Sequence, residues 1–117
     1  MRSAAGYADA MSIQEIGVDE LAQALEAGGV SLVDVREPDE WEEARVPGVI
    51  HIPLAQIPER TAELPDGTLH IICAAGGRSM QACEFLSAQG RDTVNIAGGT
   101  KGWVASGRAV ESGSADA

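Results

Sequence analysis

A cysteine stands at the start of the segment CAAGGRS, which spans residues 73–79. An apolar run precedes Cys73 and a helical pattern follows from Arg78. Small residues between a strand and a helix let backbone N–H groups converge, and the helix N-terminus adds partial positive charge. A thiol placed there is stabilised as its thiolate, which lowers its pKa from about 8.5 into the range of about 3.5–7.5. The segment therefore predicts a nucleophilic cysteine, with Arg78 and Ser79 supplying a charge and a hydroxyl.

The same residues allow a simpler interpretation. Cysteine is one of the residues most often buried, and it frequently serves as a small apolar core residue. The glycines of the segment would then only turn the chain between a strand and a helix. The segment taken alone leaves both interpretations open.

Composition narrows the classes of function. The chain has 117 residues, enough for one domain, and a formal net charge of −10, which argues against nucleic acid and against an anionic membrane surface as partners. An anionic substrate would therefore need the local positive field of the cysteine loop. The two cysteines and two histidines have no metal-ligand spacing, so we expect no metal and no organic cofactor. The N-terminus lacks a continuous apolar stretch, and we expect a cytoplasmic protein and, by default, a monomer.

Short apolar segments alternate with helical patterns along the chain. Strands are predicted at 30–35, 48–54, 69–74 and 93–96, and helices at 15–29, 37–44, 55–64, 78–90 and 98–107. This alternation of strands and helices indicates an α/β domain around a parallel sheet. Ligands of such sheets bind outside the carboxyl ends of the strands, and Cys73 falls at such an end.

Four segments then carry a family resemblance. CAAGGRSMQA resembles the active-site loop of rhodanese-like domains, C-x-x-G-x-R-S-x-x-A, and the matching residues are Cys73, Gly76, Arg78, Ser79 and Ala82. The other three segments agree with the family in order and spacing: LVDVREPDEW (32–41), VPGVIHIPL (46–54) and NIAGGTKGWVASG (95–107). The resemblance implies a three-layer domain over residues 12–110, in which helices flank a five-stranded, mostly parallel sheet. Residues 1–11 and 111–117 are predicted to be mobile ends.

The resemblance also implies a chemistry. A single-domain sulfurtransferase of this family moves sulfane sulfur from a small sulfur-containing anion, such as thiosulfate, to cyanide, a thiol or a protein thiol. Cys73 would carry the sulfur as a persulfide, and the loop residues would cradle its outer sulfur: Ala74, Ala75, Gly76, Gly77, Arg78 and Ser79. The alternative is a non-catalytic or partner-docking module that serves sulfur trafficking or regulation.

The length of the loop separates two chemistries that share this fold. Cysteine-dependent phosphatases on the same scaffold use C-x5-R, in which one further residue widens the cradle for a phosphoryl group. Here four residues lie between Cys73 and Arg78. The shorter loop favours binding of a single sulfur atom.

Three other residues leave alternatives open. Asp34 and Arg36, at the end of the preceding predicted strand, either line the site or form a buried ion pair that orients it from behind. Cys83, on the apolar face of the helix after the loop, serves either as a resolving thiol or as a core residue.

Overall fold

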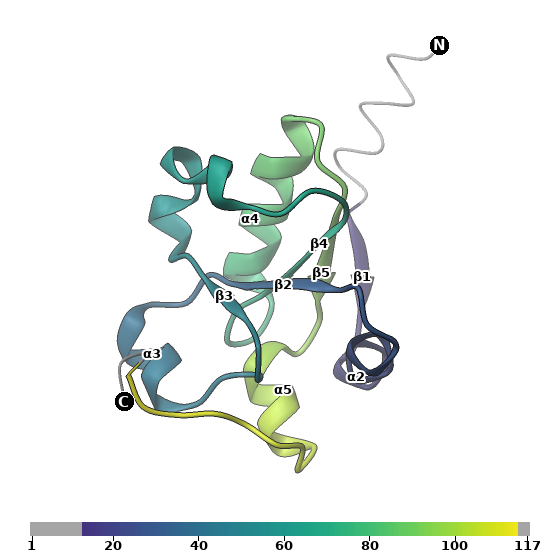
Figure 1. Ribbon diagram of the computed structural model, residues 1–117, viewed down its shortest axis with the longest axis vertical. Helices are drawn as coiled ribbons and strands as arrows, with labels where there is room; N and C mark the ends of the chain where they lie inside the picture. The colour runs from purple at the N-terminus through teal and green to yellow at the C-terminus, as the bar shows by residue number, and fades with distance from the viewer. Residues whose placement is uncertain (1–12, 115–117) are drawn as a thin grey trace.

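The computed structural model describes residues 13–114, and a five-stranded parallel sheet runs through its centre. The order of the strands across the sheet is β1-β5-β4-β2-β3. Figure 1 shows that α3 and α5 lie at the same end of the molecule. The elements are, in chain order, β1 (Gln14–Ile16), α2 (Val18–Ala27), β2 (Ser31–Asp34), α3 (Pro38–Glu43), β3 (Ile50–His51), the 3-10 helices η1 (Leu54–Glu59) and η2 (Thr61–Glu63), β4 (Leu69–Ile72), α4 (Gly77–Ala88), β5 (Thr93–Ile96) and α5 (Gly99–Ala105).

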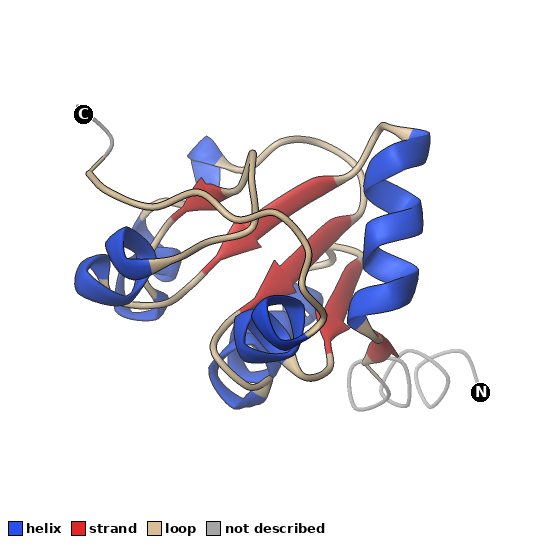
Figure 2. Cartoon of the chain, turned by 90° about the horizontal axis from the view of Figure 1, so that it is seen from below, coloured by secondary structure: helices blue, strands red, loops and turns tan. Residues whose placement is uncertain are grey.

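Helices cover both faces of the sheet, which gives the expected three layers (Figure 2). Side chains of a strand alternate between faces, so neighbouring residues of one strand enter different cores. Ile71 of β4 packs with α4 and η1, whereas Ile72 packs with α2 and α5. Both residues are fully buried. The three-layer α/β fold predicted from the resemblance is confirmed, and the described sheet is parallel throughout.

The first strand of the sheet was not predicted from the local pattern. Residues 14–16 have only one partly buried side chain, Ile16, and they precede a clear helical pattern. They become a strand because they pair in parallel with β5, from Gln14 beside Val94 to Ile16 beside Ile96. Two other elements are shorter than predicted: β3 keeps only two residues, and the predicted helix at 55–64 is divided between η1 and η2.

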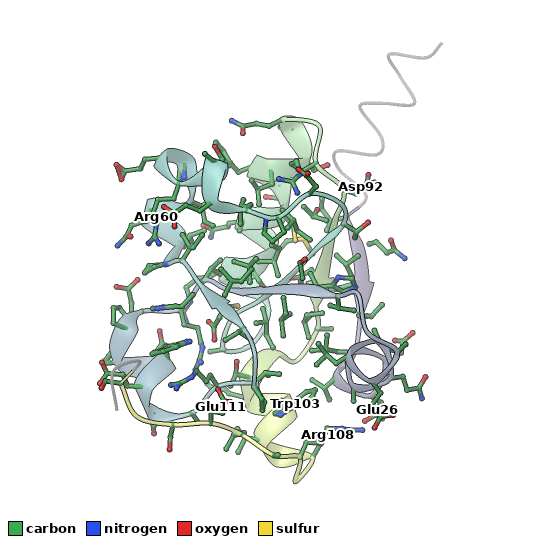
Figure 3. The ribbon with its side chains drawn as sticks, in the orientation of Figure 1. Glu26, Arg60, Asp92, Trp103, Arg108 and Glu111 are labelled. Carbon is green, nitrogen blue, oxygen red and sulfur yellow. The ribbon has the colours of Figure 1, made fainter. Side chains whose placement is uncertain are left out.

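The segment after α5 returns along the molecule (Figure 3). Hydrogen bonds hold it at two points, Ala109 and Glu111. The Trp103 indole Nε1 donates a hydrogen bond to the carbonyl oxygen of Ala109 at 2.9 Å. Further along, Arg45 and Glu111 exchange two backbone hydrogen bonds, each 2.9 Å long. The predicted start of a mobile tail at residue 111 therefore falls inside a segment that is bound to the rest of the chain. The predicted mobile segment at residues 1–11 lies outside the described residues.

No helix between residues 13 and 114 is both long enough and apolar enough to cross a membrane.

Candidate active site

Cys73 lies one residue beyond the carboxyl end of β4, where the chain turns into α4. Its side chain is 1% exposed, so the thiol lies below the surface. Gly76 makes the turn with φ +118°, in the left-handed region that favours glycine. The loop therefore bends back around the cysteine before α4 begins at Gly77.

Two groups of the loop donate to the sulfur. The backbone N–H of Gly76 lies 3.1 Å from the Cys73 Sγ, and the hydroxyl of Ser79 lies 3.3 Å from it. Burial acts to raise the pKa of the Cys73 thiol, but hydrogen bonds from the Ser79 hydroxyl and from the backbone N–H groups of Ser79, Gly76 and Ala75 together lower it below its ordinary value. The loop thus favours the thiolate through dipoles rather than through a direct contact with a charged side chain.

The loop is held from behind by the start of α5. The backbone N–H of Thr100 donates to the carbonyl oxygen of Cys73 at 2.8 Å, and the N–H of Lys101 donates to that of Ala74 at 3.0 Å. This approach requires glycine at position 99, because an added Cβ would lie 2.4 Å from the Cys73 oxygen and 2.6 Å from the Ala74 oxygen. Two of the N–H groups that lack an intrahelical partner at the start of α5 are thereby used to fix the loop.

Arg78 makes an ion pair with Glu40 of α3. Its Nη1 and Nη2 atoms donate to the two carboxylate oxygens at 2.7 and 2.8 Å, a bidentate ion pair between groups that are about one-third exposed. The side-chain hydrogen bonds from Arg78 lower the pKa of Glu40 to about 2, and the Glu40 carboxylate raises the pKa of Arg78. Arg78 therefore joins the loop to α3.

Asp34 and Arg36 form the buried ion pair that was one of the two predicted alternatives, and Arg36 also lines a cavity beside the loop, which was the other. Arg36 Nη2 lies 2.7 Å from Asp34 Oδ2, and the two side chains are 6% and 0% exposed. The guanidinium also donates to the carbonyl oxygens of Glu40, at 3.1 Å, and Ala44, at 2.8 Å. These bonds hold the carboxyl-terminal half of α3, the helix that carries the partner of Arg78.

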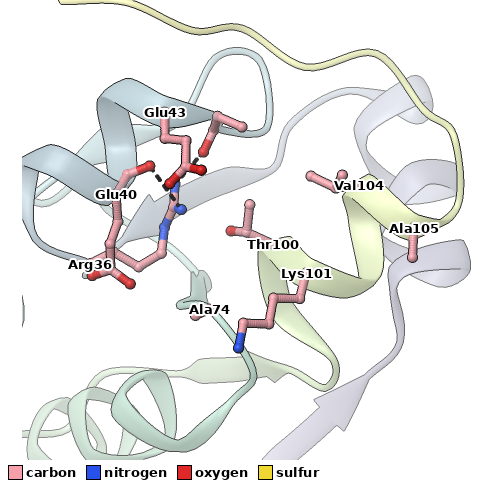
Figure 4. Close-up of a pocket in the computed structure, with 9 residues that line it drawn as sticks. Arg36, Glu40, Glu43, Ala74, Thr100, Lys101, Val104 and Ala105 are labelled. Carbon is pink, nitrogen blue, oxygen red and sulfur yellow. Dashed lines mark hydrogen bonds between the residues drawn. The ribbon is translucent and has the colours of Figure 1, made fainter.

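A cavity of about 410 Å³ opens beside the loop, between α3 and α5 (Figure 4). Ala74, one residue from the buried thiol, lines this cavity, and so does Lys101; both are labelled in the close-up. Glu43 lines the wall formed by α3, and Thr100 lines the wall formed by α5. The Thr100 hydroxyl is buried and has no hydrogen-bond partner among residues 13–114. The cavity thus has a cation and a carboxylate close to the loop, and an unpaired hydroxyl is buried in its wall.

The structure groups the predicted site residues by position. Cys73, Gly76 and Ser79 meet at the sulfur, Ala74 borders the cavity, and Ala75 and Gly77 face solvent. Sequence reasoning missed four contributors to this arrangement, which come from three other elements: Glu40, Asn95, Gly99 and Thr100. The pair Gly98–Gly99 was the one local signal among them, since adjacent glycines indicate a close backbone approach.

Cys83 lies in the core, fully buried on α4. Burial raises the pKa of its thiol to about 11, the opposite direction to that of Cys73. The interpretation of Cys83 as a core residue agrees with this position. Within residues 13–114, no three His, Cys, Asp or Glu side chains are grouped as ligands of a metal ion would be.

Comparisons with known proteins agree on one family. The family model described as the rhodanese-like domain matches residues 17–106. YtwF of Bacillus subtilis (strain 168) is 39% identical over 95 residues, which cover 80% of this chain and 92% of that protein. A protein of Allochromatium vinosum named sulfurtransferase is 38% identical over 94 residues, covering 78% of this chain and 88% of that protein.

A solved structure gives the same result for the fold. The crystal structure of a rhodanese-like domain protein from Staphylococcus aureus superposes with a TM-score of 0.74 at 35% identity, covering 78% of this chain and 91% of that chain. The relatives support a rhodanese sulfurtransferase role, which involves sulfur donors and thiol acceptors in general. From the match over residues 17–106, the loop around Cys73 and the shared fold, the chain belongs to the rhodanese-like domain family.

Proposed function

We propose that this protein transfers sulfane sulfur from a small anionic donor such as thiosulfate to a thiophilic acceptor, with Cys73 as the carrier. The observation that carries the proposal is the pair of hydrogen-bond donors on the buried sulfur, Gly76 N–H at 3.1 Å and Ser79 O–H at 3.3 Å. Fixed dipoles of this kind stabilise negative charge without reorganisation, and both a thiolate and a persulfide anion carry such charge.

The reaction proceeds by double displacement. The Cys73 thiolate attacks the outer sulfur of thiosulfate, a sulfur–sulfur bond forms, and the original sulfur–sulfur bond breaks with its electron pair leaving on sulfite. The persulfide anion then sits within the loop. Cyanide or a thiolate acceptor attacks the outer sulfur, takes it as thiocyanate or as a new persulfide, and returns the Cys73 thiolate.

Surroundings of the loop support an anionic donor. Lys101 lines the cavity beside Ala74, while the charge of Arg78 is committed to Glu40. The exposed Lys101 provides a local attraction that the overall charge of −10 does not, and it acts against the negative charge of Glu43 on the α3 wall of the same cavity. A reducing compartment would keep both thiols free, and the cytoplasm remains our prediction.

The test is the intact mass of the protein after brief exposure to thiosulfate. We expect a gain of one sulfur atom that cyanide removes, because cyanide takes sulfane sulfur from a persulfide. Cys73→Ser should show no gain. Cys83→Ala is the matched control, because it removes the other thiol, which lies in the core and has a raised pKa, and it should load normally.

Two outcomes would count against the proposal. Loading that persists in Cys73→Ser would place the carrier elsewhere. The absence of loading by both thiosulfate and a polysulfide would favour the alternative, a partner-docking module with an idle thiol.

A further inference from the structure

A buried polar side chain on the neighbouring strand reaches the hydroxyl that contacts the Cys73 sulfur. Asn95 of β5 is 1% exposed, and its carbonyl oxygen Oδ1 accepts a hydrogen bond from the Ser79 hydroxyl. Its amide nitrogen Nδ2 donates to Glu15 Oε2 of β1 at 2.8 Å and to the Gly76 carbonyl oxygen at 3.2 Å. Asn95 therefore joins the edge strand, the loop and the serine beside the thiol.

The orientation of this amide is determined by its partners. Glu15 and the carbonyl of Gly76 offer only acceptor oxygens, so the Asn95 NH₂ group must face them. The Oδ1 atom is then directed at Ser79, where it can only accept. The contact between Asn95 and Ser79 consequently uses the single hydroxyl proton of the serine.

That proton has a second possible acceptor. The Ser79 oxygen also lies 3.3 Å from the Cys73 Sγ. When the sulfur is a neutral thiol, its S–H donates to the serine oxygen while the serine proton stays on Asn95. When the sulfur is an anion, the proton stabilises it only by turning away from Asn95. Asn95 and the anionic sulfur thus compete for one proton.

We propose that Asn95 is a positioning residue that, held by Glu15 and Gly76, controls whether the Ser79 proton faces the Cys73 sulfur. While the thiol is neutral, the Ser79 hydroxyl donates its hydrogen bond to Asn95. When negative charge forms on the sulfur, the hydroxyl donates to the sulfur instead. Only the relevance of this inference to sulfur transfer rests on the proposed function, in which Cys73 is the sulfur carrier. The inference itself concerns the balance between thiol and thiolate, which can be measured without any sulfur transfer.

Other charged and titratable groups surround the loop and do not use the serine. They are Arg78 and Glu40, which pair with each other; Asp34 and Arg36, which also pair; Lys101 at the cavity; and the Cys83 thiol in the core. None of these side chains is hydrogen-bonded to Ser79 or Asn95. A variant of Asn95 therefore removes no hydrogen bond of these side chains.

The experiment measures the rate of Cys73 alkylation by iodoacetamide against pH in the full chain. Asn95→Ala removes the competing acceptor, so we expect the pKa of Cys73 to fall by about one unit, a tenfold change worth about 1.4 kcal/mol. Asn95→Asp provides a stronger acceptor, so we expect a rise of similar size. Both shifts should shrink to less than half in the Ser79→Ala background. Gln14→Glu, which adds a carboxylate on β1 outside this chain of contacts, controls for charge alone.

The expected pKa shifts of the two Asn95 variants have opposite signs, which distinguishes control of the Ser79 proton from simple support of the loop. If Asn95 only braces the loop, both substitutions loosen the donors on the sulfur and both raise the pKa of Cys73. The inference is also overturned if either shift persists in full without the Ser79 hydroxyl, or if neither variant shifts the pKa. Failure of persulfide loading with these shifts intact would refute the proposed function and leave this inference standing.

Discussion

Replacing Gly99 with alanine tests how α5 fixes the cysteine loop. The backbone at Gly99 has φ +56°, which costs an L-residue about 1–2 kcal/mol. The added Cβ would also lie 2.4 Å from the carbonyl oxygen of Cys73, about 1 Å inside ordinary contact. Because the obstructing atoms are backbone, the loop and the helix must separate.

Separation breaks two hydrogen bonds, from Thr100 N–H to the Cys73 oxygen and from Lys101 N–H to the Ala74 oxygen. Each is worth about 0.5–1.5 kcal/mol net. Together with the backbone strain, Gly99→Ala should lower the free energy of unfolding by about 2–5 kcal/mol, a large part of the 5–15 kcal/mol typical of a domain.

The control is Gly107→Ala. Gly107 also has a positive φ, +82°, but its added Cβ meets nothing within 4 Å. Only the strain of about 1–2 kcal/mol applies there. Urea unfolding of both variants, followed by tryptophan fluorescence, measures the difference. Equal destabilisation of the two variants would refute the close approach of α5 to the loop.

Three further predictions concern Glu40 of α3, Cys83 of α4 and Arg45. Glu40→Gln should lower the free energy of unfolding by about 1 kcal/mol at pH 7, a small effect because the ion pair with Arg78 is partly exposed. The pKa of Glu40 is lowered from 4.5 to about 2, so the stabilisation by this pair is complete above pH 4.5 and disappears as the pH falls toward 2. The measurement is the urea midpoint of both proteins between pH 2 and pH 7, and a difference between them that stays constant with pH would contradict the prediction. Cys83 should resist iodoacetamide at pH 8 in the native protein and react after unfolding, as peptide mass mapping would show, because burial in the core raises its pKa to about 11 and leaves little of the reactive thiolate at pH 8. Arg45→Ala removes the side chain that donates to the carbonyl oxygen of Gly113 at 2.8 Å, so amide exchange at residues 111–113 should accelerate, and unchanged exchange would mean that the side chain does not hold this segment.

The position of the thiol could be predicted from local sequence. Residues 69–72 are apolar apart from His70 and form β4, and the glycines after Cys73 turn the chain into α4. The donors around the sulfur, Gly76 and Ser79, stand three and six residues beyond it. Their convergence needs only a turn between a strand and a helix, which neighbouring residues determine.

The direction of Arg78 could not be predicted in the same way. Its position suggested a cation facing the substrate, yet it binds Glu40, which lies 38 residues away on α3. An arginine side chain reaches in several directions, and the nearest carboxylate decides among them. Only the packing of α3 beside the loop, fixed by the Asp34–Arg36 pair, brings that carboxylate within 2.7 Å.

The residues of β5 and α5 that hold the loop could not be predicted either, because their contacts join segments far apart in the sequence. Composition, alternation and motif spacing determined an α/β domain with a thiol at a strand end. The tertiary structure decided that β1 and β5 pair, which places Glu15 within 2.8 Å of Asn95 across 80 residues of sequence, and that α5 begins against the carbonyl of Cys73. These contacts depend on the order of strands across the sheet, and strand order is settled by the burial of all elements together rather than by any one segment.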